Sequence, residues 1–268
     1  MRKQLRIVWL AILTVAAVGL IGVDESAALS CGPGPHWIDG CTSPDTDHLN
    51  TGAVLGLDLP GDGLWPLDLT QPDVNLVMFG PTTVDRAAAS DTSTNFPGAF
   101  GSSADFHNDI IDIELVALSL TGGGITVTAG AGLGNGGVLP PSKGVIVEDP
   151  SDNTLAQSFF DVFFEVDLGG GLYLYNQIPL TVQSEIDRVP PNAAYHHVIT
   201  SPIPLYLGFA NIGDPDFIFA NLVTAQHIVP EPSTAVLLGL GVLGLLSMLR
   251  RGAVVSTRQK ASGNSHES

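Results

Sequence analysis

Two carboxylates in the middle of the chain have the spacing of a catalytic pair. Glu165 and Asp167 are two residues apart in "FFDVFFEVDL". On a β-strand this spacing places both side chains on one face, ~7 Å apart. Carboxyl groups in inverting glycosidases are roughly 6.5 to 9.5 Å apart. Alternating acids are equally typical of an exposed strand face. We therefore predict no catalytic residue and keep a secreted polysaccharide hydrolase using this pair as the alternative function.

Clusters of aspartate suggest a second kind of chemistry, the binding of calcium. The segments "DTD", "EDPSDN" and "DPD" bring carboxylates together, and Ca²⁺ prefers such hard oxygen ligands. None of them matches an EF-hand or a nonapeptide calcium repeat, and Asp is also a common turn former. We predict no cofactor, with calcium as the alternative. Its candidate ligands are Asp45, Asp47, Asp149, Asp152, Asp214 and Asp216.

The two cysteines of the chain, Cys31 and Cys41, flank "GPGPHWIDG". In an oxidising compartment a local disulfide is the expected fate of such a pair. The alternative is lipidation of Cys31, because "ALSC" loosely resembles a bacterial lipobox. Lipidation would leave Cys41 without a partner. We predict the disulfide, and a lipid mass on Cys31 would contradict it.

Residues 31–228 are predicted to form one all-β domain. Short apolar runs are separated by Gly, Pro, Asp and Asn, and no long amphipathic helix pattern competes. This pattern favours an antiparallel β-sandwich or jelly-roll-like fold. The clearest predicted strand, Ser158 to Leu168, places five residues on the core face, namely Phe160, Val162, Phe164, Val166 and Leu168.

Two neighbouring segments are less regular. The stretch from Ile110 to Leu120 carries Asp112 and Glu114 on the face that later holds Leu118, so this strand is predicted to enter the core from an acidic rim. The polar segment 85–103 is predicted to be an exposed loop.

The formal charge of the chain is −17. Between residues 31 and 229 the cationic side chains are Arg86, Lys143 and Arg188. Affinity for nucleic acids depends on Lys and Arg neutralising phosphates, so nucleic-acid binding is excluded. High negative charge favours the solubility of an exported protein.

Residues 1–30 have the pattern of a secretory signal peptide. Arg2, Lys3 and Arg6 precede an apolar run that extends to Val23, and small residues follow. An uncleaved membrane anchor is the alternative. In both cases the acidic region is translocated across the membrane.

A second apolar run, Ala235 to Leu249, lies close to the C-terminal end. As a helix it would reach roughly 22 Å, which is short against the ~30 Å hydrocarbon layer of a bilayer. Arg250 and Arg251 follow it directly, which is the positive-inside signature of a transmembrane helix. Pro230 and Pro232 favour an extended, accessible segment before it. The predicted topology places the body outside and residues 252–268, a polar tail, in the cytoplasm.

Residues 229–251 resemble the PEP-CTERM sorting signal of Gram-negative bacteria. The resemblance rests on the Pro-Glu-Pro triplet, the Gly- and Leu-rich span and the arginine pair, with sorting residues Val229, Pro230, Glu231, Pro232, Ser233, Arg250 and Arg251. It implies an exosortase, an integral membrane transpeptidase or protease that cuts near the triplet, as a partner. It also implies an inner-membrane-anchored precursor that reaches the cell surface or the extracellular matrix, with exopolysaccharide as a candidate partner.

We therefore expect an exported component of the cell envelope or exopolysaccharide matrix rather than an enzyme, with a structural, adhesive or ligand-binding role. The sequence names no ligand.

Overall fold

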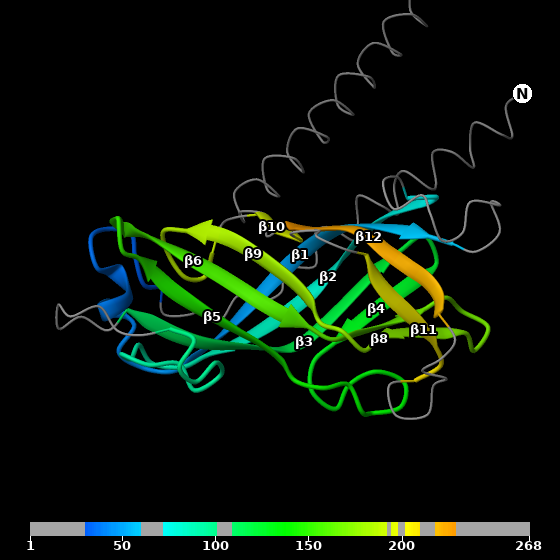
Figure 1. The fold of residues 1–268 in the computed structure, drawn as a ribbon, viewed down its shortest axis with the longest axis horizontal. Coiled ribbons are helices and arrows are strands. Elements are labelled where there is room, and N and C mark those ends of the chain that lie inside the picture. Colours follow the sequence, from blue (N-terminus) through cyan, green and yellow to red (C-terminus); the bar gives the residue numbers. More distant parts are fainter. Residues whose placement is uncertain are drawn as a thin grey trace, which may run out of the picture. The chain divides into compact units, whose positions relative to one another are not determined.

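A computed structural model describes residues 30–59, 72–100, 109–191, 194–197, 202–209 and 218–228 (Figure 1). This part of the chain contains a short 3₁₀ helix, η1 (Trp37–Gly40), and twelve strands. The strands are β1 (Asp45–Asp58), β2 (Val74–Arg86), β3 (Ile110–Gly122), β4 (Ile125–Ala129), β5 (Ser142–Asp149), β6 (Asp152–Val162), β7 (Phe164–Asp167), β8 (Tyr173–Asn176), β9 (Leu180–Ile186), β10 (Ala194–His197), β11 (Ile203–Leu207) and β12 (Ile218–Ile228).

All twelve strands belong to one antiparallel sheet, which confirms the prediction of an antiparallel all-β body. The sheet differs from the predicted sandwich because it closes on itself. β3 pairs with β5 along its first half and with β4 along its second half. β12 pairs with β1 on one side and with β10 and β11 on the other. Closure pairs the strand edges that a two-sheet sandwich would leave at its margins.

A β-bulge in β3 explains why the positions in register with Asp112 and Glu114 become apolar at Leu118 and Leu120. Thr83 pairs with Ala117, but the next residue, Val84, pairs with Leu115, so Val116 is the extra residue. An extra residue shifts the alternation by one position. The buried side chains are therefore Ile111, Ile113 and Leu115 before the bulge, and Leu118 and Leu120 after it.

The strand predicted over Ser158 to Leu168 is divided into β6 and β7 at Phe163. At this point, hydrogen bonds with side chains replace the missing backbone hydrogen bonds between strands. Ser142 Oγ accepts a hydrogen bond from the Phe163 backbone N–H at 2.9 Å, and the Asn176 amide bonds to Phe164 N–H and to Val162 C=O. The predicted core face persists across the break. All five of its members are buried or packed against the core.

The core fills the inside of the closed sheet. Inward positions alternate with exposed ones along β2, where Met78, Thr82 and Val84 are buried and Val77 and Phe79 are exposed. This is the period-two pattern of a sheet with one buried face.

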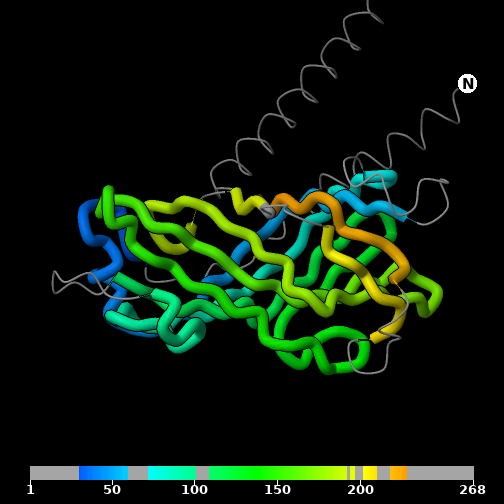
Figure 2. The backbone as a smooth tube through the Cα atoms, in the orientation of Figure 1, coloured from blue at the N-terminus to red at the C-terminus, as the bar shows by residue number. Residues whose placement is uncertain are grey.

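The segment that contains η1 lies against the turn between β5 and β6, as the blue part of the tube shows at one end of the body (Figure 2). The backbone N–H of His36 donates to the carbonyl of Asn153 at 2.8 Å, and Cys31 forms a bridge to Val189. These contacts fix the N-terminal part of the described chain on the sheet.

Two predicted segments fall outside the described residues. They are the signal peptide, except for its last residue, and the sorting signal with its apolar run. Within the described ranges, no helix has both the length and the apolar character needed to cross a membrane.

Candidate functional site

The closed sheet surrounds a cavity of about 100 Å³. Strands from around the sheet contribute inward-facing side chains to it, because every strand of a closed sheet has one face toward the interior. Most of its wall is hydrocarbon. Representative lining residues are Leu115, Leu118, Leu120, Val127, Ile146 and Phe164.

Several polar side chains also face this cavity. Asp47, Thr82, Arg86, Tyr195 and His227 line it together with the apolar wall. Asp47 and Arg86 are each only 3% exposed, and Thr82 is 1% exposed. The cavity is therefore apolar with a small number of buried polar groups, which is the usual composition of a small-molecule site.

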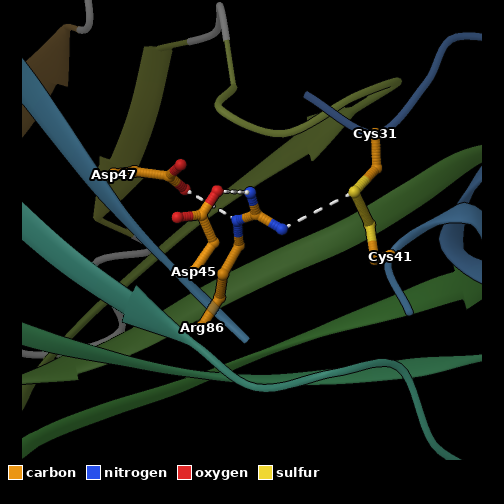
Figure 3. The surroundings of a disulfide bond; sticks show 5 residues. All are labelled: Cys31, Cys41, Asp45, Asp47 and Arg86. Atoms are coloured by element: carbon orange, nitrogen blue, oxygen red, sulfur yellow. Dashed lines mark hydrogen bonds and ion pairs between the residues drawn. A yellow bond between two sulfur atoms is a disulfide. The ribbon is translucent and has the colours of Figure 1, made fainter. Parts of the chain in front are cut away.

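Strand register places the charged residues of this group together. Arg86 is the direct cross-strand partner of Asp45, and Asp47 is the diagonal neighbour. Arg86 donates from Nη2 to Asp45 Oδ2 at 3.0 Å and from Nε to Asp47 Oδ2 at 3.2 Å (Figure 3). Burial raises the pKa of the Asp47 carboxyl above its ordinary value, although the Arg86 charge opposes this shift.

The guanidinium of Arg86 also reaches the disulfide. Cys31 and Cys41 are joined by a disulfide bond, and Arg86 Nη1 lies 3.5 Å from Cys31 Sγ (Figure 3). Both cysteines are buried. The covalent loop is therefore packed directly beside the buried ion pair.

Tyr195 and His227 are cross-strand partners on β10 and β12, with ring centroids 6.0 Å apart. Tyr195 Oη donates to Ser158 Oγ at 2.9 Å. Burial raises the pKa of Tyr195 to about 12 and lowers that of His227 to about 4. Both side chains are therefore neutral at pH 7.

Three polar atoms of this group have no hydrogen-bond partner among the described residues. They are Asp47 Oδ1, Thr82 Oγ1 and His227 Nε2. Buried polar atoms normally have partners, because leaving one unsatisfied costs the free energy of its desolvation. A group supplied by a ligand would satisfy them.

Four of the calcium candidates lie in two pairs, Asp45 with Asp47 on β1 and Asp149 with its cross-strand partner Asp152. Asp45 and Asp47 bind Arg86. Asp149 accepts hydrogen bonds from Ser151 N–H and Oγ, which lower the pKa of this carboxyl. Asp152 forms the same pair of bonds with Thr154, which lower its pKa in turn.

His36 contacts two further residues of "EDPSDN". His36 Nδ1 lies 3.0 Å from Glu148 Oε1, and its Nε2 lies 2.8 Å from Asn153 Nδ2. Asp214 and Asp216 lie outside the described residues. Across the ranges that the structure describes, no three His, Cys, Asp or Glu side chains are grouped so that they could hold a metal ion.

The carboxylates of the alternative hydrolase differ in their surroundings. Glu165 is 5% exposed, and its Oε1 accepts a hydrogen bond from the Asn135 N–H at 2.7 Å. Burial raises its pKa, with a further contribution from Asp167. Asp167 accepts a hydrogen bond from the Gly169 N–H in the next turn. Glu165 thus anchors the glycine-rich loop 130–139 instead of facing an open cleft.

The C-terminal segment matches a known family model. Residues 229–251 match the family described as the PEP-CTERM protein-sorting motif. The protein carries a PEP-CTERM signal. Val229, the Pro-Glu-Pro triplet, Ser233 and the arginine pair all lie inside the matched range. The PEP-CTERM motif supports an exported, membrane-anchored precursor that is processed by an exosortase.

The body has a structural relative. DynF from the dynemicin biosynthesis pathway of Micromonospora chersina superposes with a TM-score of 0.53 at 19% sequence identity. The match covers 78% of this chain and 90% of DynF. At this identity the similarity shows a shared fold only. No curated protein matches the PEP-CTERM chain.

The cavity was not predicted from the sequence, and of its polar residues only Asp47 was named as a candidate site residue, a calcium ligand. Thr82, Arg86 and His227 each stand beside another polar residue in a strand, namely Thr83, Asp85 and Gln226, and nothing in this pattern marks them as facing a cavity. The one available signal was Arg86, a rare cation in an acidic body.

Proposed function

We propose that this protein is an exported component of the cell envelope or exopolysaccharide matrix whose β body binds a small ligand, and that it acts without catalysis. The sorting motif supports export and exosortase processing. The apolar cavity inside the closed sheet supports ligand binding more than a purely structural or adhesive role. It is the single observation that carries the binding function.

In this account the precursor is anchored in the inner membrane of a Gram-negative bacterium by residues 235–249. The exosortase recognises the triplet at Pro230 to Pro232 and releases the body to the cell surface or the matrix. Exopolysaccharide is the candidate partner there. The high negative charge keeps the released body soluble.

The sorting part is tested by replacing Pro230, Glu231 and Pro232 with alanine in cells that contain an exosortase. The variant is expected to stay in the membrane fraction, while the wild type is released. A matched control replaces Ser262, Gly263 and Asn264, outside the matched range, with alanine and is expected to be released normally. Equal release of both variants would contradict the assignment.

The raised pKa of Glu165 favours one second candidate, a polysaccharide hydrolase in which this residue is the general acid. The contact between Glu165 and the Asn135 N–H argues for a structural role instead. Release of reducing ends from exopolysaccharide by the wild type, and its loss in Glu165→Gln with unchanged thermal stability, would establish the enzyme.

A further inference from the structure

We infer that the cavity inside the closed sheet binds a small, uncharged, apolar molecule with one hydroxyl group, and that this hydroxyl is recognised by Asp47 and Thr82, which are diagonal neighbours in the β1–β2 register. This inference rests on the proposed ligand-binding function and specifies the chemical class of the ligand.

We infer an apolar ligand from the side chains that line the cavity. Leucine, isoleucine, valine and phenylalanine side chains from strands around the sheet supply most of the lining. A cavity with an apolar wall of this kind gains by taking up hydrocarbon. A volume of about 100 Å³ accommodates a short alkyl chain or a single small ring, not a lipid with two chains.

The hydroxyl follows from two neighbouring polar atoms that lack partners among the described residues, Asp47 Oδ1 and Thr82 Oγ1. An ionised carboxylate only accepts hydrogen bonds, and the threonine hydroxyl both donates and accepts. A ligand hydroxyl can donate to the first and accept from the second. An alkane could satisfy neither.

We infer that the ligand is uncharged because the charged side chains at the cavity already pair with one another. The Arg86 guanidinium is already bound by Asp45 and Asp47, so it does not offer an open site for a carboxylate. The buried Arg86–Asp47 pair is neutral as a unit, and the more exposed Asp45 is not among the residues that line the cavity. Tyr195 and His227, which face the same space, carry no charge at neutral pH. A charged head group would lose its hydration and gain no opposite charge.

The test uses methyl NMR spectra of the full-length protein in detergent, titrated with n-hexanol, n-hexane or hexanoate. Binding is read from cavity-facing methyl groups of Ile113, Leu115 and Val127. Val77, which is exposed on β2, reports non-specific effects of ligand and detergent. We expect saturable shifts of the cavity methyls alone, with n-hexanol binding at least tenfold more tightly than n-hexane and hexanoate not binding.

Two variants assign the contacts. Thr82→Val removes the hydroxyl with little change of shape, so the preference for n-hexanol over n-hexane is expected to disappear while n-hexane binding is unchanged. Ala53→Leu places a larger side chain in the cavity and is expected to abolish the binding of both. Circular dichroism melts of both variants report whether they are folded, and a second filling variant, Ala225→Leu, replaces Ala53→Leu if that one is not.

The outcomes separate this inference from the function on which it rests. Equal binding of n-hexanol and n-hexane, tighter binding of hexanoate, or an unchanged preference in Thr82→Val would overturn the hydroxyl ligand and leave a ligand-binding cavity in place. If none of the three probes shifts the cavity methyls, the inference and the proposed binding function are both wrong, and sorting through the tail is unaffected.

Discussion

Arg86 Nε donates a hydrogen bond to Asp47 Oδ2 across 3.2 Å, between two side chains that are almost completely buried. The two residues lie on neighbouring strands, and the β1–β2 register makes them diagonal neighbours on the inner face of the sheet. Their pairing places a buried ion pair beside an apolar cavity. It explains why an acidic body keeps a cation at this position.

Removing Arg86 should destabilise the protein strongly. Arg86→Met leaves the Asp47 carboxylate buried without its cation, and breaking a buried pair costs about 3 to 5 kcal/mol. Urea unfolding at pH 7 measures this loss. Arg188→Met is the control, because Arg188 pairs with Asp187 on the exposed surface and exposed pairs contribute roughly 1 kcal/mol or less. Equal effects of the two substitutions would show that the Arg86 pair is not a buried one.

The disulfide should contribute measurably to stability. Cys31 and Cys41 are ten residues apart, and closing a loop of this size reduces the entropy of the unfolded chain by an amount worth about 3 kcal/mol. The double variant Cys31→Ser/Cys41→Ser is expected to unfold at lower denaturant by that amount. The mass of the mature N-terminus provides the check on the chemistry. A diacylglyceryl group on Cys31 would rule the disulfide out.

His227 should make stability depend on pH. Its pKa is lowered by burial to about 4 in the folded protein, against 6.5 in the unfolded chain. Between these values the unfolded chain binds a proton that the folded protein does not, so stability is lost as pH falls. For this residue the loss between pH 7 and pH 5 is about 2 kcal/mol.

The comparison that isolates this effect is with His227→Phe, which cannot be protonated. Unfolding free energies of the wild type and the variant, measured by urea titration at both pH values, should differ in their pH dependence by that amount. Parallel pH profiles would mean that the imidazole is accessible to solvent.

The Asp112 carboxylate should fix the conformation of residues 93–95, which follow β2. Burial raises its pKa, but hydrogen bonds from the Ser93 and Thr94 hydroxyls and from the Thr94 and Asn95 N–H groups outweigh this and lower it. A lowered pKa means that the ionised form stabilises the fold above the unfolded pKa and that this contribution is lost as pH falls.

Asp112→Asn is expected to speed amide exchange at Thr94 and Asn95 at neutral pH, while amides in β6 keep their wild-type protection. Acidification of the wild type should produce the same local change. Unchanged exchange in the variant would show that other contacts fix this segment.

Local features of the fold were predictable from the sequence, and its closure was not. Alternating residues such as Phe160, Val162 and Phe164 predict a strand and its buried face because the period of two is a local property. A sandwich and a closed sheet contain the same alternation. They differ in whether β1 pairs with β12, which are far apart in the chain, and no local pattern encodes that pairing.

The acidic residues show the same limit. "DTD" and "EDPSDN" predict carboxylates in proximity, and the structure places them near the ends of strands. Asp45 and Asp47 form ion pairs with Arg86 from the neighbouring strand, and His36, from a distant segment, binds Glu148. Asp149 and Asp152 are instead satisfied locally by Ser151 and Thr154. The segment 85–103 was expected to be an exposed loop, yet Ser93 is buried through its contact with Asp112.

The mass of the released protein tests the central claim most directly. Cells that express the full chain and an exosortase should release a body that begins near Cys31 and ends near Pro230, Glu231 and Pro232, without the apolar run 235–249. Intact mass measurement with peptide mapping of both ends gives the answer. A released protein that retains Arg250 and Arg251 would contradict the account.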